Sequence, residues 1–110
     1  MSREIKFRAW NGEQMISPDY ITRNGIGYWK ENSIPSYSKE LMQFTGLRDK
    51  KGVDIYENDI ILYQGAKGEV YYCNDTCMFM VRFRLNRSSW SFNSMDEEIE
   101  VIGNIHNNKN

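Results

Sequence analysis

The sequence predicts a mainly β fold, and three observations support this prediction. Apolar and polar residues alternate with a period of two along most of the chain, which is the spacing of half-buried strands. Turn sequences such as Asn11-Gly12 separate these segments at short intervals. Helical periodicity never persists for about ten residues, and the best candidate for a helical turn is 38–42. The residues alone therefore indicate a small barrel or sandwich of short strands.

The first predicted strand is Glu4–Trp10, which has two distinct faces. These faces are Ile5, Phe7 and Ala9 on one side and Lys6, Arg8 and Trp10 on the other. Asn11-Gly12 is a strong turn signal, and 14–17 is a short partner strand. The stretch 20–38 holds three strand-like fragments, and we expect a loop-rich β excursion there. We also expect this excursion to cover Trp10, because a large aromatic side chain left in water forfeits about 2–3 kcal/mol of burial.

Strands and turns alternate more regularly after Leu41. The predicted strands are 41–45, 53–56, 60–64 and 69–73, and the predicted turns are 49–52, 57–59 and 65–68. These turns are rich in Gly, Asn and Asp. Gly and Asn tolerate a positive φ, and Asp can bond the backbone two residues further on. Each pair of neighbouring strands is therefore expected to form an antiparallel hairpin.

The segment Met78–Leu85 has the clearest alternation in the chain. We expect Phe79, Val81, Phe83 and Leu85 to face the core and Met78, Met80, Arg82 and Arg84 to face away from it. A short strand follows at 90–92, then an acidic stretch at 96–98. The last predicted strand is 99–105, and the polar tail at 106–110 is expected to be disordered.

Composition and charge exclude several classes of protein. The chain has 110 residues, of which 40% are hydrophobic and 14% aromatic, as in a globular domain. No apolar run approaches the roughly 20 residues of a membrane span, and the N-terminus does not resemble a signal peptide. We therefore expect a cytoplasmic protein with no membrane partner. A net charge of −1 argues against a dedicated nucleic-acid coat, which would be strongly basic.

No group of residues predicts catalysis, a cofactor or a metal site. Cys73, Cys77 and His106 are the chain's only cysteine and histidine side chains, too few for a usual structural zinc site. The two cysteines flank a predicted turn, and a reducing cytosol would keep them as free thiols. The carboxylates Asp49, Asp54, Glu57 and Asp59 lie in or beside turns, where backbone hydrogen bonding favours Asp. We therefore predict that the protein is not an enzyme, although acid–base work or cation binding by these acids is the alternative.

The best candidate for a binding surface is a basic strand face with neighbouring aromatic residues. Its predicted members are Lys6, Arg8, Met80, Arg82, Arg84, Arg87 and Trp90. Arg, Met and Trp are enriched at protein interfaces, which favours a protein partner. Arginines beside a tryptophan could instead bind single-stranded or duplex nucleic acid through phosphate contacts and stacking. The third interpretation is structural, with the face covered by the N-terminal extension and the arginine stems packed over it.

Three segments together resemble the YopX family of phage and prophage proteins. They are Glu4–Trp10, Met42–Ile61 and Glu100–Ile105, and their order and spacing span essentially the whole chain. The middle segment is the most specific, because it combines Thr-Gly-Leu, a basic Asp-Lys-Lys-Gly turn and Ile-Tyr-Glu-Asn-Asp-Ile. Asn58 stands where members of the family usually carry Gly, and both residues accept a left-handed backbone.

The resemblance implies a fold and an origin rather than a reaction. It implies an SH3-like small barrel with an N-terminal β extension, so that 1–110 is a single YopX-like domain with the extension at 1–40 and the barrel at 41–105. It implies a phage or prophage accessory protein without a catalytic signature. We therefore expect a non-catalytic module that binds a protein partner in the bacterial host. Nucleic acid is the alternative partner, and a second copy of the chain is a further candidate.

Overall fold

The computed structural model describes residues 4–92, 95 and 98–106. The protein is mainly β, with 57% of its residues in strands that form three antiparallel sheets, which confirms the predicted class. In the described ranges, no helix is long and apolar enough to cross a membrane. The chain divides into two compact units, Met1–Phe44 and Thr45–Asn110, and the boundary lies inside the strand β6 (Leu41–Arg48).

The first unit begins with a hairpin of β1 (Phe7–Trp10) and β2 (Met15–Ile16). Asn11 closes the hairpin because its Oδ1 accepts the backbone N–H groups of residues 13 and 14, both at 2.8 Å. On its other side, β1 pairs with the beginning of β6. Ala9 is fully buried as predicted, but Ile5 is 62% exposed because it precedes the strand, so its assignment to the apolar face was wrong.

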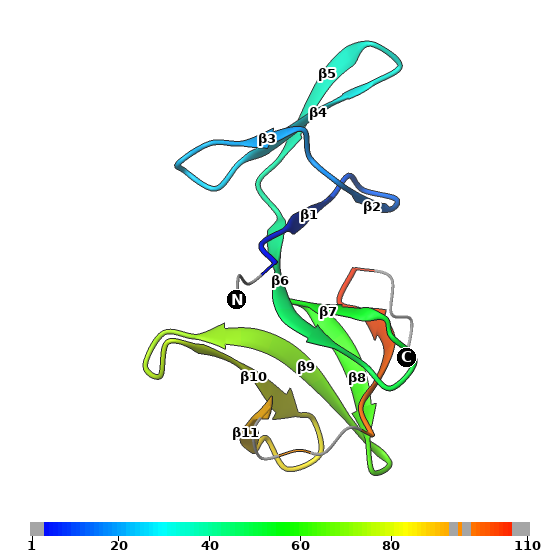
Figure 1. Ribbon diagram of the computed structural model, residues 1–110, viewed down its shortest axis with the longest axis vertical. Helices are drawn as coiled ribbons and strands as arrows, with labels where there is room; N and C mark the ends of the chain where they lie inside the picture. Colours follow the sequence, from blue (N-terminus) through cyan, green and yellow to red (C-terminus); the bar gives the residue numbers. More distant parts are fainter. Residues whose placement is uncertain (1–3, 93–94, 96–97, 107–110) are drawn as a thin grey trace. The chain divides into compact units, whose positions relative to one another are not determined.

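The stretch 20–38 forms a regular three-stranded sheet rather than a loop-rich excursion (Figure 1). Its strands are β3 (Tyr20–Ile21), β4 (Gly27–Glu31) and β5 (Ile34–Ser38), in that order. Both turn residues between β4 and β5 have a positive φ, 51° at Asn32 and 68° at Ser33, which matches the twist of a tight hairpin. The segment 38–42 joins β5 to β6 without a helical turn.

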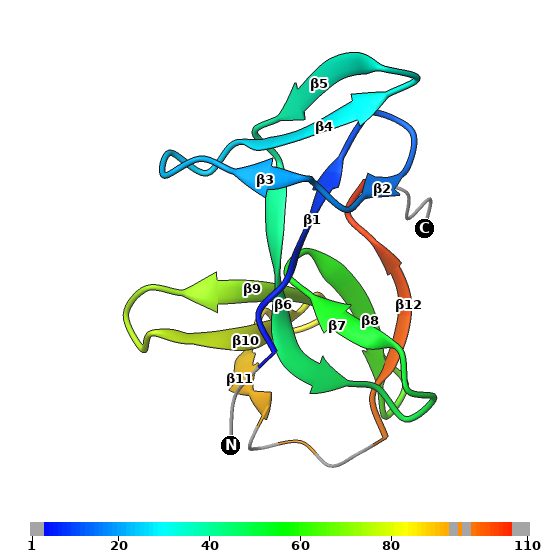
Figure 2. The same cartoon turned by 45° about the horizontal axis from the view of Figure 1, so that its top comes forward.

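The second unit is built on a curled five-stranded sheet, in the order β11-β10-β9-β8-β12 (Figure 2). Its strands are β8 (Asp59–Tyr63), β9 (Ala66–Cys73), β10 (Met78–Phe83), β11 (Ser89–Ser91) and β12 (Glu100–Asn104). The end of β6 pairs with β7 (Asp54–Tyr56). The buried core comprises Ile55, Ile61, Tyr63, Val70, Val81, Phe83, Met95 and Ile99. The sheet is a half-barrel, and closure into an SH3-like barrel stays a prediction.

The turn between β8 and β9 is shorter than the predicted turn at 65–68. It contains only Gln64 and Gly65, with φ values of 50° and 81°, so Gly68 lies inside β9. A Cβ at Gly68 would lie 2.5 Å from Cγ1 of Val81 and 3.1 Å from Cδ1 of Phe83. A glycine is therefore required at position 68 by the close packing of β9 against side chains of β10, and not by a turn.

The alternation predicted for Met78–Leu85 is correct from Val81 to Arg84 and wrong at Leu85, whereas Phe79 and Met80 are both half-buried. Val81 is fully buried and Phe83 is 6% exposed, whereas Arg82 and Arg84 are exposed. Leu85, which was predicted to face the core, is 94% exposed. The strand ends at Phe83, and the chain then leaves the sheet in the loop 84–88. The acids at 96 and 97 and the tail at 107–110 lie outside the described residues.

Candidate functional site

The candidate site surrounds the loop 84–88, which joins β10 to β11. The backbone N–H of Phe83 donates to the carbonyl oxygen of Ser88 at 2.8 Å. Inside the loop, Oδ1 of Asn86 accepts from the backbone N–H and the hydroxyl of Ser88, at 3.0 and 2.7 Å. Leu85 and Asn86 line one hollow, and Arg84 and Arg87 line another. The loop therefore separates two surfaces of different chemistry.

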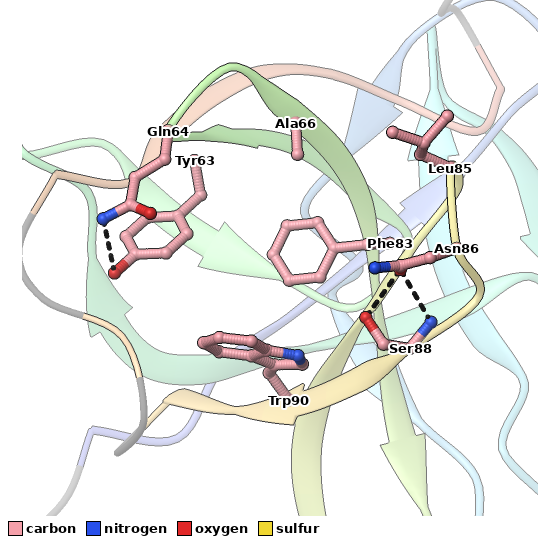
Figure 3. A pocket seen from close by; sticks show the side chains of 8 residues that line it. All are labelled: Tyr63, Gln64, Ala66, Phe83, Leu85, Asn86, Ser88 and Trp90. Atoms are coloured by element: carbon pink, nitrogen blue, oxygen red, sulfur yellow. Dashed lines mark hydrogen bonds between the residues drawn. The ribbon is translucent and has the colours of Figure 1, made fainter.

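The first hollow is the aromatic pocket, which has a volume of about 160 Å³ (Figure 3). It is lined by Tyr63, Gln64, Ala66, Phe83, Leu85, Asn86, Ser88 and Trp90. The Phe83 ring is near two other rings, with its centroid 6.4 Å from that of Tyr63 and 6.1 Å from that of Trp90. The Phe83 and Trp90 rings meet edge to face, at 84°. Trp90 is nevertheless 43% exposed, so the pocket presents large apolar groups to solvent.

The structure places Trp90 on the opposite side of the sheet from the basic strand face. Trp90 pairs with Val81 in the antiparallel register of β10 and β11, and paired residues point to the same face. It therefore shares the inner face with Val81 and Phe83, whereas Arg82 points outward. The sequence could not show this, because the face of β11 depends on the length of the loop 84–88 and on the pairing register.

The second hollow is the arginine hollow, formed by Glu69, Arg82, Phe83, Arg84 and Arg87. Arg82 lies directly opposite Glu69 across β9 and β10, and its guanidinium carbon is 4.3 Å from the ring centroid of Tyr71. Tyr71 is held in turn, because its hydroxyl donates to Oγ of Ser89 at 2.9 Å. Three arginines around one carboxylate give this hollow a positive charge.

The remaining members of the predicted surface have different surroundings. Met80 pairs with Tyr71 on the outer face of β10 and is half-buried. Lys6 belongs to the first unit, where its ammonium lies 4.7 Å from the ring centroid of Phe44 and 3.5 Å from the Glu4 carboxylate. Arg8 lies on β1 opposite Met42, also in the first unit. The arginine hollow therefore contains Arg82, Arg84 and Arg87 from the predicted set.

Two of the turn carboxylates bond the backbone, as predicted. Asp49 is 7% exposed, and its two oxygens accept the N–H groups of Lys51, Val53 and Val101 at 2.8–2.9 Å. Burial acts to raise the pKa of Asp49, but these hydrogen bonds and the Lys51 charge outweigh it and hold the pKa below its ordinary value. Asp59, 1% exposed, accepts the N–H of Tyr56 at 2.8 Å.

The other candidate groups are Asp54 and the two cysteines. Asp54 forms an ion pair with Arg48 at 2.9 Å. Cys73 and Cys77 are free thiols, and hydrogen bonding from Thr76 lowers the pKa of Cys73. Across the described ranges, no three His, Cys, Asp or Glu side chains are grouped closely enough to hold a metal ion.

Comparison with known proteins identifies a family and a fold. The family model described as YopX protein matches residues 6–110. Comparison with curated proteins found no significant match. Among solved structures, the crystal structure of protein EF1440 from Enterococcus faecalis is similar, with a TM-score of 0.60 and 24% sequence identity. The match covers 96% of this chain and 95% of EF1440, and at this identity the likeness concerns the fold.

Proposed function

The chain belongs to the YopX protein family, and on this premise we propose that it is a non-catalytic phage or prophage accessory module that binds a protein partner in the cytoplasm of the bacterial host. The observation that carries the proposal is the aromatic pocket beside the loop 84–88, with Trp90 43% and Leu85 94% exposed. Exposed apolar groups around a preformed pocket are typical of interaction sites.

The two hollows together suggest the chemistry of the partner. The aromatic pocket has room for one apolar side chain, and tryptophan and arginine are the residues most often found in binding hot spots. The arginine hollow would attract acidic groups and guide association. We therefore propose a partner segment with an apolar anchor residue close to acidic residues. The curled sheet supports the further proposal that the second unit is an SH3-like barrel, a fold in which aromatic grooves bind peptides.

Capture from host lysate with matched variants tests this function. The wild-type protein and Tyr37→Ala, which removes an exposed aromatic group from the first unit, should retain the same partner. Trp90→Ala should lose most of it, because truncating a hot-spot residue costs about 2 kcal/mol or more. A partner retained equally by all three proteins, or no specific partner in infected and uninfected lysates, would contradict the proposal. Sedimentation of the protein alone reveals whether the partner is a second copy.

Nucleic-acid binding is the second candidate, and the arginine hollow is the observation that favours it. Arg82, Arg84 and Arg87 could contact phosphates while Tyr71 stays stacked under Arg82. The net charge of −1 is the argument against it. Fluorescence anisotropy with single- and double-stranded oligonucleotides at about 50 and 200 mM salt tests it, because phosphate contacts weaken steeply with salt. Absence of binding at the lower salt concentration eliminates this candidate.

A further inference from the structure

The outer edge of the strand β5 is not used by the proposed function. β5 lies at one edge of the sheet β3-β4-β5, and among the described residues no other strand pairs with it. The sheet belongs entirely to the first unit, whereas the aromatic pocket and the arginine hollow belong to the second. An exposed strand edge presents unpaired backbone N–H and C=O groups, so it can accept one further strand.

The register of β4 and β5 shows which backbone groups face this edge. The two-residue turn makes Glu31 and Ile34 a hydrogen-bonded pair, and such pairs then alternate with non-hydrogen-bonded pairs along the hairpin. Pro35 and Tyr37 therefore belong to non-hydrogen-bonded pairs, and their backbone groups point away from β4. Pro35 suits this position because it has no N–H. Its carbonyl oxygen and both backbone groups of Tyr37 form no hydrogen bond within the described ranges.

Three tyrosines form a row across one face of this sheet, and the row ends at the same edge. Tyr20 lies directly opposite Tyr28, and Tyr28 lies directly opposite Tyr37. The Tyr20 and Tyr28 rings stack with their centroids 5.2 Å apart, and the Tyr28 and Tyr37 centroids are 5.8 Å apart at 33°. Tyr37 is 63% exposed. The row therefore ends at β5 with an open position for a further ring beside Tyr37.

We propose that β5 pairs antiparallel with β5 of a second copy of the chain, with the two-fold axis at Tyr37. In this register the two Tyr37 residues face each other and exchange both N–H···O=C bonds, so each outward group of Tyr37 is paired. An axis at Ser36 would instead place each Tyr37 carbonyl opposite the nitrogen of Pro35, which cannot donate a hydrogen bond. The backbone groups of the edge therefore favour the axis at Tyr37.

A second copy suits this edge because the contact is self-complementary. Its own Tyr37 would continue the row of rings into the second sheet, and aromatic residues directly opposite each other stabilise strand pairing. On the other face, Ser36 would lie opposite Ser38 of the second copy, which pairs two small neutral side chains. The strand Ile34–Ser38 contains no charged residue, so its pairing with itself creates no like-charge repulsion. These are the requirements of a two-fold interface.

Sedimentation of the full-length protein at increasing concentration tests the proposal. The wild type should form a reversible dimer as its concentration rises from about 10 μM to 1 mM, because a contact through one strand pair is small and small interfaces are weak. Tyr37→Lys should weaken dimerisation about tenfold or more, since it removes the central ring pair and places two like charges opposite each other. Lysine is common on exposed strand edges, so this variant should keep its fold, which circular dichroism checks.

Tyr20→Lys is the matched control, because it makes the same substitution at a ring that is 61% exposed on the other edge strand of the sheet. This variant should dimerise as the wild type does. Trp90→Ala should also dimerise normally, because the aromatic pocket lies in the other unit, so loss of partner capture and loss of the dimer are separate results. A further measurement needs no variant: the backbone N–H of Tyr37 should exchange more slowly with solvent as the dimer forms.

Three results would overturn the proposal. The first is a monomer at every concentration, which would leave this edge for a strand of another protein. The second is a dimer that Tyr37→Lys does not weaken, or that Tyr20→Lys weakens equally. The third is a dimer that is lost in Trp90→Ala, which would place the contact between the two copies in the aromatic pocket.

Discussion

Asp49 shows how one buried carboxylate can serve the fold rather than a reaction. It bonds Lys51 and Val53 within its own turn and Val101 on β12. The same turn also bonds the residue that precedes β12, because the N–H of Lys50 donates to the carbonyl oxygen of Ile99 at 3.0 Å. The turn chemistry of Asp49 was predictable from its neighbours. Its contact with β12 was not, because that partner lies 52 residues further along the chain.

Replacing Asp49 should produce a pH-dependent loss of stability. At pH 7, Asp49→Ala should lower the free energy of unfolding by about 3 kcal/mol, because three backbone N–H groups lose a charged acceptor. The folded pKa lies below the ordinary 3.8, so this stabilisation is complete well above pH 3.8 and declines as the pH falls through the folded pKa. Urea unfolding of the wild type and of Asp49→Ala between pH 3 and 7 measures how their difference in stability changes with pH. A difference that stays constant over this range would contradict the assignment.

The strand β10 illustrates what alternation can and cannot predict. The period of two correctly assigned Val81 and Phe83 to the core and Arg82 to the surface, because a strand with one buried face must alternate. The pattern does not show where a strand ends, so Leu85 was assigned to the wrong environment. Trp90 was misplaced for a related reason, since its face follows from a pairing register that involves two strands.

Phe83 and Leu85 are two residues apart, so a regular strand would place both on the same face. Because the strand ends at Phe83, they should nevertheless respond differently to truncation. Phe83→Ala should destabilise the protein by about 3–5 kcal/mol, because it leaves a cavity among the core residues. Leu85→Ala should change stability by less than about 0.5 kcal/mol, because the side chain is 94% exposed. The double variant Arg82→Ala/Arg84→Ala should also melt close to the wild type. Thermal melts of these variants test the predictions. A larger loss of stability from the arginine double variant than from Phe83→Ala would refute the strand assignment.

At the scale of the whole molecule, burial is distributed unequally between the two units. The main core cluster lies entirely within the second unit, between Ile55 and Ile99. The first unit buries fewer large side chains, among them Trp29, Met42 and Phe44. Its three-stranded sheet also carries the exposed rings of Tyr20 and Tyr37, and the Tyr20 ring stacks on that of the half-buried Tyr28 at 5.2 Å and 8°. These stacked rings stabilise strand pairing more than they contribute to a core.

Hydrogen exchange should therefore differ between the two units of the intact protein. Amides of β3–β5 should exchange through local opening, at a lower free energy than amides of β8–β10, because fewer buried apolar contacts protect them. Exchange measured by NMR or mass spectrometry under native conditions tests this expectation. Equal protection in both sheets would mean that the two units unfold together as one cooperative structure.

The glycine within β6 has a consequence for how this sequence can change over generations. Gly46 has a φ of +89°, and a Cβ at this position would meet nothing within 4 Å. The penalty for another residue there is therefore conformational rather than steric, about 1 kcal/mol for an L-amino acid. Every single-nucleotide change of a glycine codon that encodes a different amino acid introduces a Cβ. Every single-nucleotide substitution that replaces this glycine therefore carries the conformational penalty, although the new side chain would meet no steric obstacle.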